Sequence, residues 1–227
     1  MLTAIAIIPS APVLVPQLVG AAADEVADLR HAVLAAAAAL PDRWVAVGVG
    51  PADETVIAAT AGTFAGYGVD LRVALSPGAD DVRGIPLSAL ITGWVRGEAR
   101  PDAHAEVHVL SEQHAAADAM QRGRELRSVV DDIDGPVGVL VVADGANTLT
   151  EKAPGGYDPG SVAVQSALDD ALAAGDVAAL AELPPSITGR VAWQALAGLA
   201  GSGPRSVKEL YRGAPLGVGY FAGVWQP

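Results

Sequence analysis

Short runs of apolar residues alternate with longer alanine-rich stretches along most of the chain. The short runs are rich in valine and isoleucine, and several are apolar at consecutive positions, which is typical of strands covered on both faces. Such an alternation indicates a mainly parallel sheet with helices packed against it. The strands that this pattern predicts are 2–8, 44–50, 69–75, 105–110 and 137–143.

The alanine-rich stretches carry their apolar residues with helical period. In the first of them, Val26 and Leu29 fall on one stripe and Asp28 falls on the opposite side, so this helix is expected to pack on the sheet. Gly175 is placed to end one helix, and Asp176 is placed to cap the next one. The predicted helices are 22–40, 86–95, 113–130, 162–174, 176–183 and 190–200.

The end of the chain changes character, because 206–213 and 215–225 combine aromatic residues with flanking glycines and predict a pair of strands. No internal repeat, low-complexity linker or long run of like charges divides the sequence. We therefore expect an α/β fold with three layers: a mainly parallel sheet, helices on both faces, and a C-terminal strand pair at one edge. The same absence of divisions predicts a single domain over residues 1–227.

Composition narrows the chemistry. Acidic residues outnumber basic ones by 26 to 14, and the formal charge of −12 would repel nucleic acid and anionic lipid surfaces. The chain has no cysteine, so thiolate catalysis, zinc fingers and iron–sulfur clusters are excluded. No apolar run approaches the roughly 20 residues of a membrane-spanning helix. The opening MLTAIAIIP lacks a basic start and ends at Pro9, so it predicts a first strand rather than an export signal, and we expect a cytoplasmic protein.

Three polar loops follow predicted strands. Ligands of open α/β sheets bind outside the carboxyl ends of the strands, so these loops are expected to line a pocket. The plain alternative is that the loops are polar because they are exposed, with Glu151 and Lys152 as a solvated pair. The candidate pocket residues are Ser10, Pro12, Asp53, Glu54, Asp144, Asn147, Glu151, Lys152, Tyr157 and Asp158.

Other motifs receive little support. GVGPAD has two glycines of a dinucleotide fingerprint, but Asp53 stands where the third should open a helix, and its carboxylate would repel a pyrophosphate. GSGPRSVKE lacks the spacing of a phosphate-binding loop. His104 and His108 lie well apart on a predicted strand, so nothing places them together as metal ligands. No G-x-S-x-G motif is present to indicate a serine nucleophile.

Taken over nearly its full length, the chain resembles the catalytic subunit of the class III extradiol ring-cleavage dioxygenases, a group that also includes the Memo-like proteins. Pro9 and Pro12 after the first strand carry the resemblance, together with GPADET after the second strand and VVADG at 141–145. TGRVAWQALAGLAG around Trp193 completes it. The resemblance implies a three-layer α/β fold and, in active members, a ferrous ion held by two histidines and one glutamate, which binds a catechol and dioxygen.

The residues that the family uses to hold iron are missing. Where the resemblance places the first histidine, the chain has Ser10-Ala11-Pro12, and where it places the second, the chain has Ala52-Asp53-Glu54. Gly189 stands at the position of the glutamate, and the acid–base histidine falls within Asn147 to Thr150. Glycine supplies no ligand and a serine hydroxyl binds iron weakly, so we expect no iron cofactor. Asp53, Glu54 and Asp144 remain an alternative ligand set for a hard cation such as magnesium.

The leading functional hypothesis is therefore a small-molecule binder, or a degenerate enzyme, that keeps the pocket of the family without its iron. Asp144 and Asn147 would form hydrogen bonds, Lys152 would attract a phenolic or anionic ligand, Glu151 would be its partner or a general base, and Tyr157 would cover an aromatic ring.

Two alternatives stay open. The same crevice would suit metal-independent acid–base or hydrolytic catalysis, with Glu151 or Asp144 as the base and its pKa raised by burial. Alternatively, the chain is a non-catalytic protein that forms dimers through its C-terminal edge. A homodimer is also the default for a protein of this class. The aromatic anchors of that edge would be Tyr211, Tyr220, Phe221 and Trp225.

Overall fold

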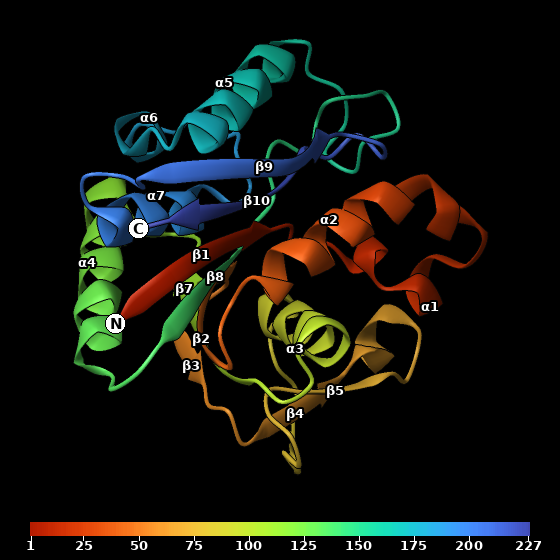
Figure 1. The fold of residues 1–227 in the computed structure, drawn as a ribbon. Helices are drawn as coiled ribbons and strands as arrows, with labels where there is room; N and C mark the ends of the chain where they lie inside the picture. Colours follow the sequence, from red (N-terminus) through yellow and green to blue (C-terminus); the bar gives the residue numbers. More distant parts are fainter.

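A seven-stranded mixed sheet forms the centre of the molecule, with strand order β3-β7-β2-β8-β1-β10-β9 (Figure 1). The computed structural model describes residues 1–227, apart from the side chains of residues 21 and 22. The four inner strands β7, β2, β8 and β1 are parallel, whereas β3 and the C-terminal strands run antiparallel to their neighbours. The strands are β1 (Leu2–Ile8), β2 (Arg43–Gly50), β3 (Glu54–Val56), β7 (His104–Ser111), β8 (Val137–Val142), β9 (Ser206–Gly213) and β10 (Tyr220–Gln226).

Helices cover both faces of this sheet, so the predicted three-layer α/β architecture is confirmed (Figure 1). α2 (Ala27–Ala38) and α3 (Leu87–Ala99) lie on one face. The other face carries α4 (Ala116–Asp132), α5 (Gly160–Ala174), α6 (Val177–Ala181) and α7 (Arg190–Ala200). Every residue of β8 is buried, because each of its faces packs on a different hydrophobic layer. None of the helices in the part of the chain that the structure describes has the length and apolar character that a membrane crossing requires.

The strand predicted at 69–75 does not join this sheet. Only Arg72–Ala74 form a strand there, β5, and it pairs with β4 (Thr60–Thr63) in a separate sheet whose third member is β6 (Asp81–Val82). These strands are only two to four residues long and lie beside α3 (Figure 1). The alternation of apolar residues is the same in both kinds of sheet, so it could not tell them apart.

Most local signals gave the right boundaries. α7 covers the predicted residues, Gly175 ends α5 with a φ of +71°, and Asp176 caps α6 by accepting the N–H groups of Ala178 and Ala179. The first helix is shorter than predicted, because the segment Gly20–Val26 is a 3-10 helix and α2 begins only at Ala27. Two further 3-10 segments, Pro12–Leu14 and Phe64–Tyr67, and the one-turn helix α1 (Pro16–Val19) complete the chain.

The predicted C-terminal strand pair is confirmed at one edge of the sheet, where β10 pairs with β1 and β9 pairs with β10. Three of its aromatic side chains, Tyr220, Phe221 and Trp225, are buried within the chain. Tyr211 is partly buried against the same hydrophobic layer as Tyr220. These side chains therefore offer no exposed anchors, and the hypothesis of a dimer through this edge loses the residues on which it was built.

Candidate functional site

The loops after β1 and β8 meet at the carboxyl edge of the sheet, because these two strands are direct parallel neighbours. The backbone N–H of Ser10 donates to Oδ1 of Asp144 over 2.9 Å, so two predicted site residues are brought together. Pro12 lies two residues further on, at the first position of a 3-10 turn. Among the residues that the structure describes, this is the one hydrogen bond that the Asp144 side chain receives.

Residues at the start of α7 hold the backbone of Asp144 in place. Its carbonyl oxygen accepts the N–H of Gly189 over 2.9 Å and the indole Nε1–H of Trp193 over 3.2 Å. Trp193 is buried, and Gly189 lies directly against Asp144 at the start of α7. These two hydrogen bonds therefore fix the backbone of Asp144. One donor, Gly189, is the residue for which the resemblance predicted a glutamate.

Burial dominates the electrostatics of this carboxyl group. Removal from water raises the pKa of Asp144 from 3.8 to about 7, and the Ser10 N–H offsets only part of that effect. Burial raises the pKa of the nearby Tyr220 hydroxyl above its usual value. The negative charge of the Asp144 carboxylate raises the pKa of Tyr220 further. Asp144 nevertheless retains some exposed surface. A carboxyl group with these properties exchanges a proton readily near neutral pH.

The segment 147–158 contributes less to the site than its composition suggested. Glu151, Lys152 and Tyr157 are exposed, and within the described part of the chain their side chains form no hydrogen bond or ion pair. Asp158 precedes α5 and accepts the N–H of Gly160, the first residue of that helix, over 2.9 Å. Asn147 is partly buried beneath the backbone of the same loop. The expectation that Glu151 and Lys152 line a pocket with Asp144 is thus not supported by any contact.

Two residues that the sequence analysis overlooked hold the start of this loop. Gln165 of α5 accepts the Ala146 N–H over 2.8 Å and donates to Oδ1 of Asp169 over 2.8 Å. Burial raises the pKa of Asp169 to about 6, and the hydrogen bond from Gln165 opposes the shift. Both side chains are buried. Their signal in the sequence was two polar residues four positions apart on the apolar stripe of a predicted helix, beside Leu168 and Leu172.

Asp53 and Glu54 lie elsewhere. Glu54 belongs to β3, which pairs on the far side of β7, so three strands separate it from β1. With strands about 4.8 Å apart, that distance excludes a shared site with Ser10 and Asp144. Asp53 accepts the Ser111 N–H at 2.7 Å and contacts His114 Nε2 at 2.7 Å and Arg122 at 3.2 Å. The Ser111 N–H, followed by His114 and Arg122, holds the pKa of Asp53 below its usual value. The proposed set Asp53, Glu54 and Asp144 therefore cannot bind one cation.

The donor atoms do not fit a ferrous ion held by two histidines and a glutamate. In the described chain, no group of three histidine, aspartate or glutamate side chains comes close enough to hold a metal. At Gly189 even a single added carbon would lie 2.5 Å from the Asp144 carbonyl oxygen, so no ligand side chain could extend from this position without rearrangement. We derive no chemistry from iron at this site.

Comparisons with known proteins establish the fold but no activity. Neither the models of known protein families nor the curated protein sequences give a match. Among solved structures, the uncharacterized protein JW3007 from Escherichia coli K12 is similar, with a TM-score of 0.55 and 10% sequence identity. The alignment covers 98% of this chain and 99% of that chain, so the two share their architecture over their whole described length.

Proposed function

We propose that this chain binds a small molecule at the carboxyl edge of the sheet and that Asp144 exchanges a proton with it without a metal ion. One observation carries the proposal: a carboxyl group with a pKa of about 7 lies where open α/β sheets bind their ligands. The resemblance to the extradiol dioxygenase catalytic subunit suggests that the chain derives from a ring-binding scaffold that no longer holds ferrous iron.

The charge at this site favours a particular class of ligand. At pH 7 about half of the Asp144 carboxyl groups are ionised, and no described cationic side chain forms an ion pair with them. The chain as a whole has a formal charge of −12. An anionic group placed beside it would be repelled. A neutral phenol or other hydroxyl group would instead accept a hydrogen bond from the protonated carboxyl or donate one to the carboxylate. We therefore propose a hydroxyl-bearing, uncharged ring as the ligand class.

Calorimetry tests the proposal directly. Neutral phenols and catechols are titrated into the protein at pH 7 in buffers of different ionisation enthalpy, with chelator present. We expect binding linked to uptake or release of a fraction of a proton, and we expect Asp144→Asn to abolish the proton linkage. Glu151→Gln is the matched control, because Glu151 is an exposed carboxylate of the same loop, and it should leave the linkage unchanged.

Two results would contradict the proposal. One is ligand binding whose proton linkage survives in Asp144→Asn. The other is stoichiometric binding of ferrous iron, measured by elemental analysis after anaerobic loading, that is required for the ligand to bind. Circular dichroism of Asp144→Asn confirms that the variant is folded before either result is interpreted.

A further inference from the structure

A cavity of about 440 Å³ lies between α3 and the edge strand β5, two elements that lie side by side in Figure 1. α3 comes close to β5 at Gly93, where an added carbon would lie 3.3 Å from the Ala74 carbonyl oxygen. Among the described residues that line the cavity, Arg96 of α3 and Arg72 of β5 face a single carboxylate, Glu98. The lining is therefore positively charged, although the whole chain has a formal charge of −12.

Arg96 is buried without an ion pair, since 7% of its surface is exposed and no described carboxylate pairs with it. Its Nε donates to the Ala74 carbonyl oxygen over 2.8 Å, and its Nη1 donates to the carbonyl oxygens of Pro101 and Ala103. These hydrogen bonds orient the guanidinium group but bring no negative charge to it. Burial lowers the pKa of Arg96, and the charge of Asp102 offsets only part of that effect. Buried charges in proteins are normally paired.

Two buried side chains of the cavity keep donor groups without an acceptor in the described chain. Nη2 of Arg96 donates to no protein atom, yet it is not sealed off by its surroundings. The same holds for Nε1 of Trp94, which is 5% exposed, whereas the other three tryptophans each donate to a backbone carbonyl oxygen. Arg72 donates to the Ala79 carbonyl oxygen over 2.8 Å through one Nη2 only. An oxyanion would accept from all three side chains.

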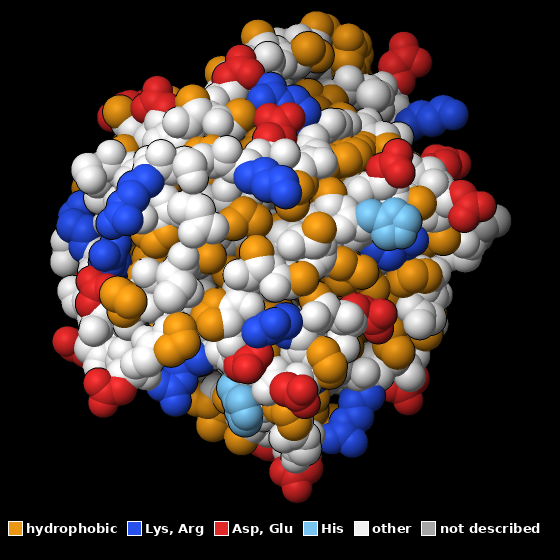
Figure 2. Space-filling model, in the orientation of Figure 1, with side chains coloured by type: hydrophobic (Ala, Val, Ile, Leu, Met, Phe, Trp, Pro, Cys, Tyr) orange, Lys and Arg blue, Asp and Glu red, His pale blue; other side chains and the backbone are white. Residues whose placement is uncertain are grey.

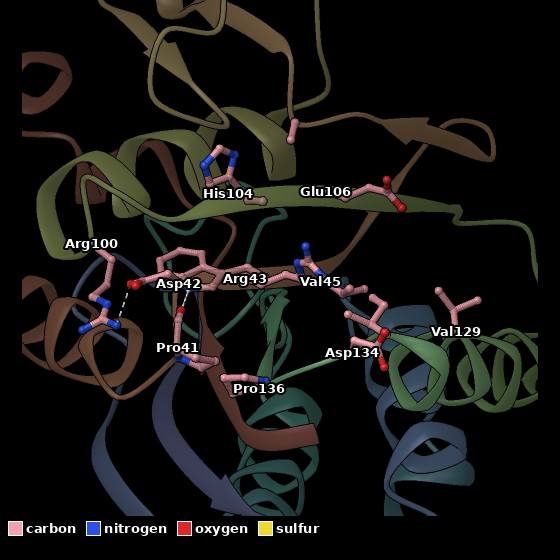
Figure 3. A pocket seen from close by; sticks show the side chains of 14 residues that line it. Pro41, Asp42, Arg43, Val45, Arg100, His104, Glu106, Val129, Asp134 and Pro136 are labelled. Carbon is pink, nitrogen blue, oxygen red and sulfur yellow. Dashed lines mark hydrogen bonds and ion pairs between the residues drawn. The ribbon is translucent and has the colours of Figure 1, made fainter. Parts of the chain in front are cut away.

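The larger groove at the amino ends of β2 and β7 has the opposite character (Figure 3). Three carboxylates line it, Asp42, Glu106 and Asp134, against the two arginines Arg43 and Arg100. Arg100 is already neutralised there, because it pairs with Asp42 at 2.7 Å (Figure 3). Acidic and basic side chains are also intermixed on the face shown in Figure 2. An anion would be repelled by the groove, so the charge of its lining distinguishes the cavity between α3 and β5.

We propose that the cavity between α3 and β5 binds a small molecule through an oxyanion, a carboxylate or phosphate group, held by Arg96, Arg72 and Trp94. Two oxygen atoms of such a group match the two parallel N–H groups on one edge of a guanidinium. The volume leaves room for a carbon skeleton beside the oxyanion, and Leu71 supplies an apolar contact for it. The site is separate from Asp144, which does not line this cavity and would repel an anion.

Calorimetric titration at pH 7, with the ionic strength held constant by chloride, tests the proposal. The probes are inorganic phosphate and benzoate. We expect saturable binding of at least one of them at concentrations up to about 10 mM. Both present the same oxyanion chemistry, and the one that binds more tightly identifies phosphate or carboxylate as the preferred group.

Arg72→Gln should weaken the binding by about tenfold, because it removes a charged donor. Arg205→Gln is the matched control: Arg205 is also exposed and loses the same charge, but it does not line the cavity, so binding should change little. Glu98→Gln should strengthen the binding, because it removes the lining carboxylate. Arg96→Met should abolish it, with circular dichroism confirming that this variant is folded.

The absence of saturable binding by both anions overturns the proposal. So does equal weakening by Arg72→Gln and Arg205→Gln, or a Glu98→Gln variant that binds the anion no more tightly than the wild type. Because Arg96 also holds three backbone carbonyl oxygens, its variant is the one at risk of unfolding. The exposed positions Arg72 and Glu98 decide the question in that case.

Discussion

Asp53 and Asp144 both follow parallel strands at the carboxyl edge of the sheet, yet their surroundings differ. Asp53, at the β7 side, is contacted by a backbone N–H, an imidazole and a guanidinium. Asp144, beside β1, receives a single backbone N–H. The pKa of Asp53 lies below 3.8, whereas the pKa of Asp144 rises to about 7. The same residue type at the same kind of position therefore has opposite properties.

The difference shows which of the two aspartates has a structural role. Asp53 is ionised at neutral pH and ties the loop after β2 to the turn after β7 and to α4. Its hydrogen bonds leave little capacity for a ligand. Asp144 is fixed through its backbone rather than through its carboxylate, so a change in its protonation state breaks none of the backbone hydrogen bonds that hold the loop, although the buried charge lowers the stability of the fold. A buried carboxyl group that the fold does not need as an anion is a strong candidate for function.

Asp144→Asn should give the largest effect on stability. Because folding raises the pKa of Asp144 from 3.8 to about 7, its contribution to stability is fully present below about pH 4 and is lost as the pH rises through 7. The variant should therefore be more stable than the wild type at pH 8, by on the order of 3 kcal/mol, with partial exposure of the residue reducing that figure.

Urea denaturation from pH 4 to pH 8 measures this effect. The wild type should lose stability across the range, and Asp144→Asn should retain only the smaller slope that Asp169, with a pKa of about 6, leaves. Asp53→Asn is the control and should keep the wild-type slope, because Asp53 is already ionised over the whole range. An unchanged slope in Asp144→Asn would show that the carboxyl group is better solvated than its burial indicates.

Much of this comparison could be predicted from the sequence. Consecutive apolar residues identified β1 and β8, and the rule that ligands bind at carboxyl ends selected the loops that contain Ser10 and Asp144. These predictions were right because they depend only on the local pattern of apolar residues and on the direction of parallel strands. Both can be inferred directly from the sequence.

The rest depends on tertiary arrangement. The periodicity of apolar residues does not specify the order of strands in a sheet. It therefore did not predict the short strand β3, which places Glu54 on the far side of β7. Polar composition does not distinguish a lining residue from an exposed one, which is why Glu151 and Lys152 were included with Asp144. Gln165 reaches Ala146 only because α5 packs beside the strand edge, and no local signal specifies that packing.

Gly189→Ala should have an intermediate effect on the free energy of unfolding, because it disturbs the packing around Asp144 and leaves the surroundings of Asp53 unchanged. The added Cβ would lie 2.5 Å from the Asp144 carbonyl oxygen and 2.7 Å from the Ala143 Cβ, so α7 and the loop must move apart. The backbone φ of −84° is open to any residue, so the cost comes from crowding and should be about 1–3 kcal/mol.

Chemical denaturation of Gly189→Ala at pH 7 is compared with Gly97→Ala. Gly97 lies in α3 with open space around it, so alanine there should stabilise the protein slightly, by up to about 1 kcal/mol. If both variants behaved alike, the contact between Gly189 and Asp144 would not be what fixes this site.

Asp53→Asn should give the smallest effect, although Asp53 has more partners than Asp144. Its side chain is 40% exposed, and ion pairs in contact with water contribute below about 1 kcal/mol.

Because folding lowers the pKa of Asp53, its stabilisation is present above pH 3.8 and is lost as the pH falls through the lowered value. Urea denaturation at pH 7 and pH 3, in low and high salt, should show a larger loss of stability at pH 7 than at pH 3, and mainly in low salt. Asp80→Asn, at an exposed carboxylate with no ion pair in the described structure, should change nothing. A loss for Asp53→Asn as large as the gain for Asp144→Asn would mean that partners outweigh burial at this sheet edge, and the contrast between the two aspartates would then reverse.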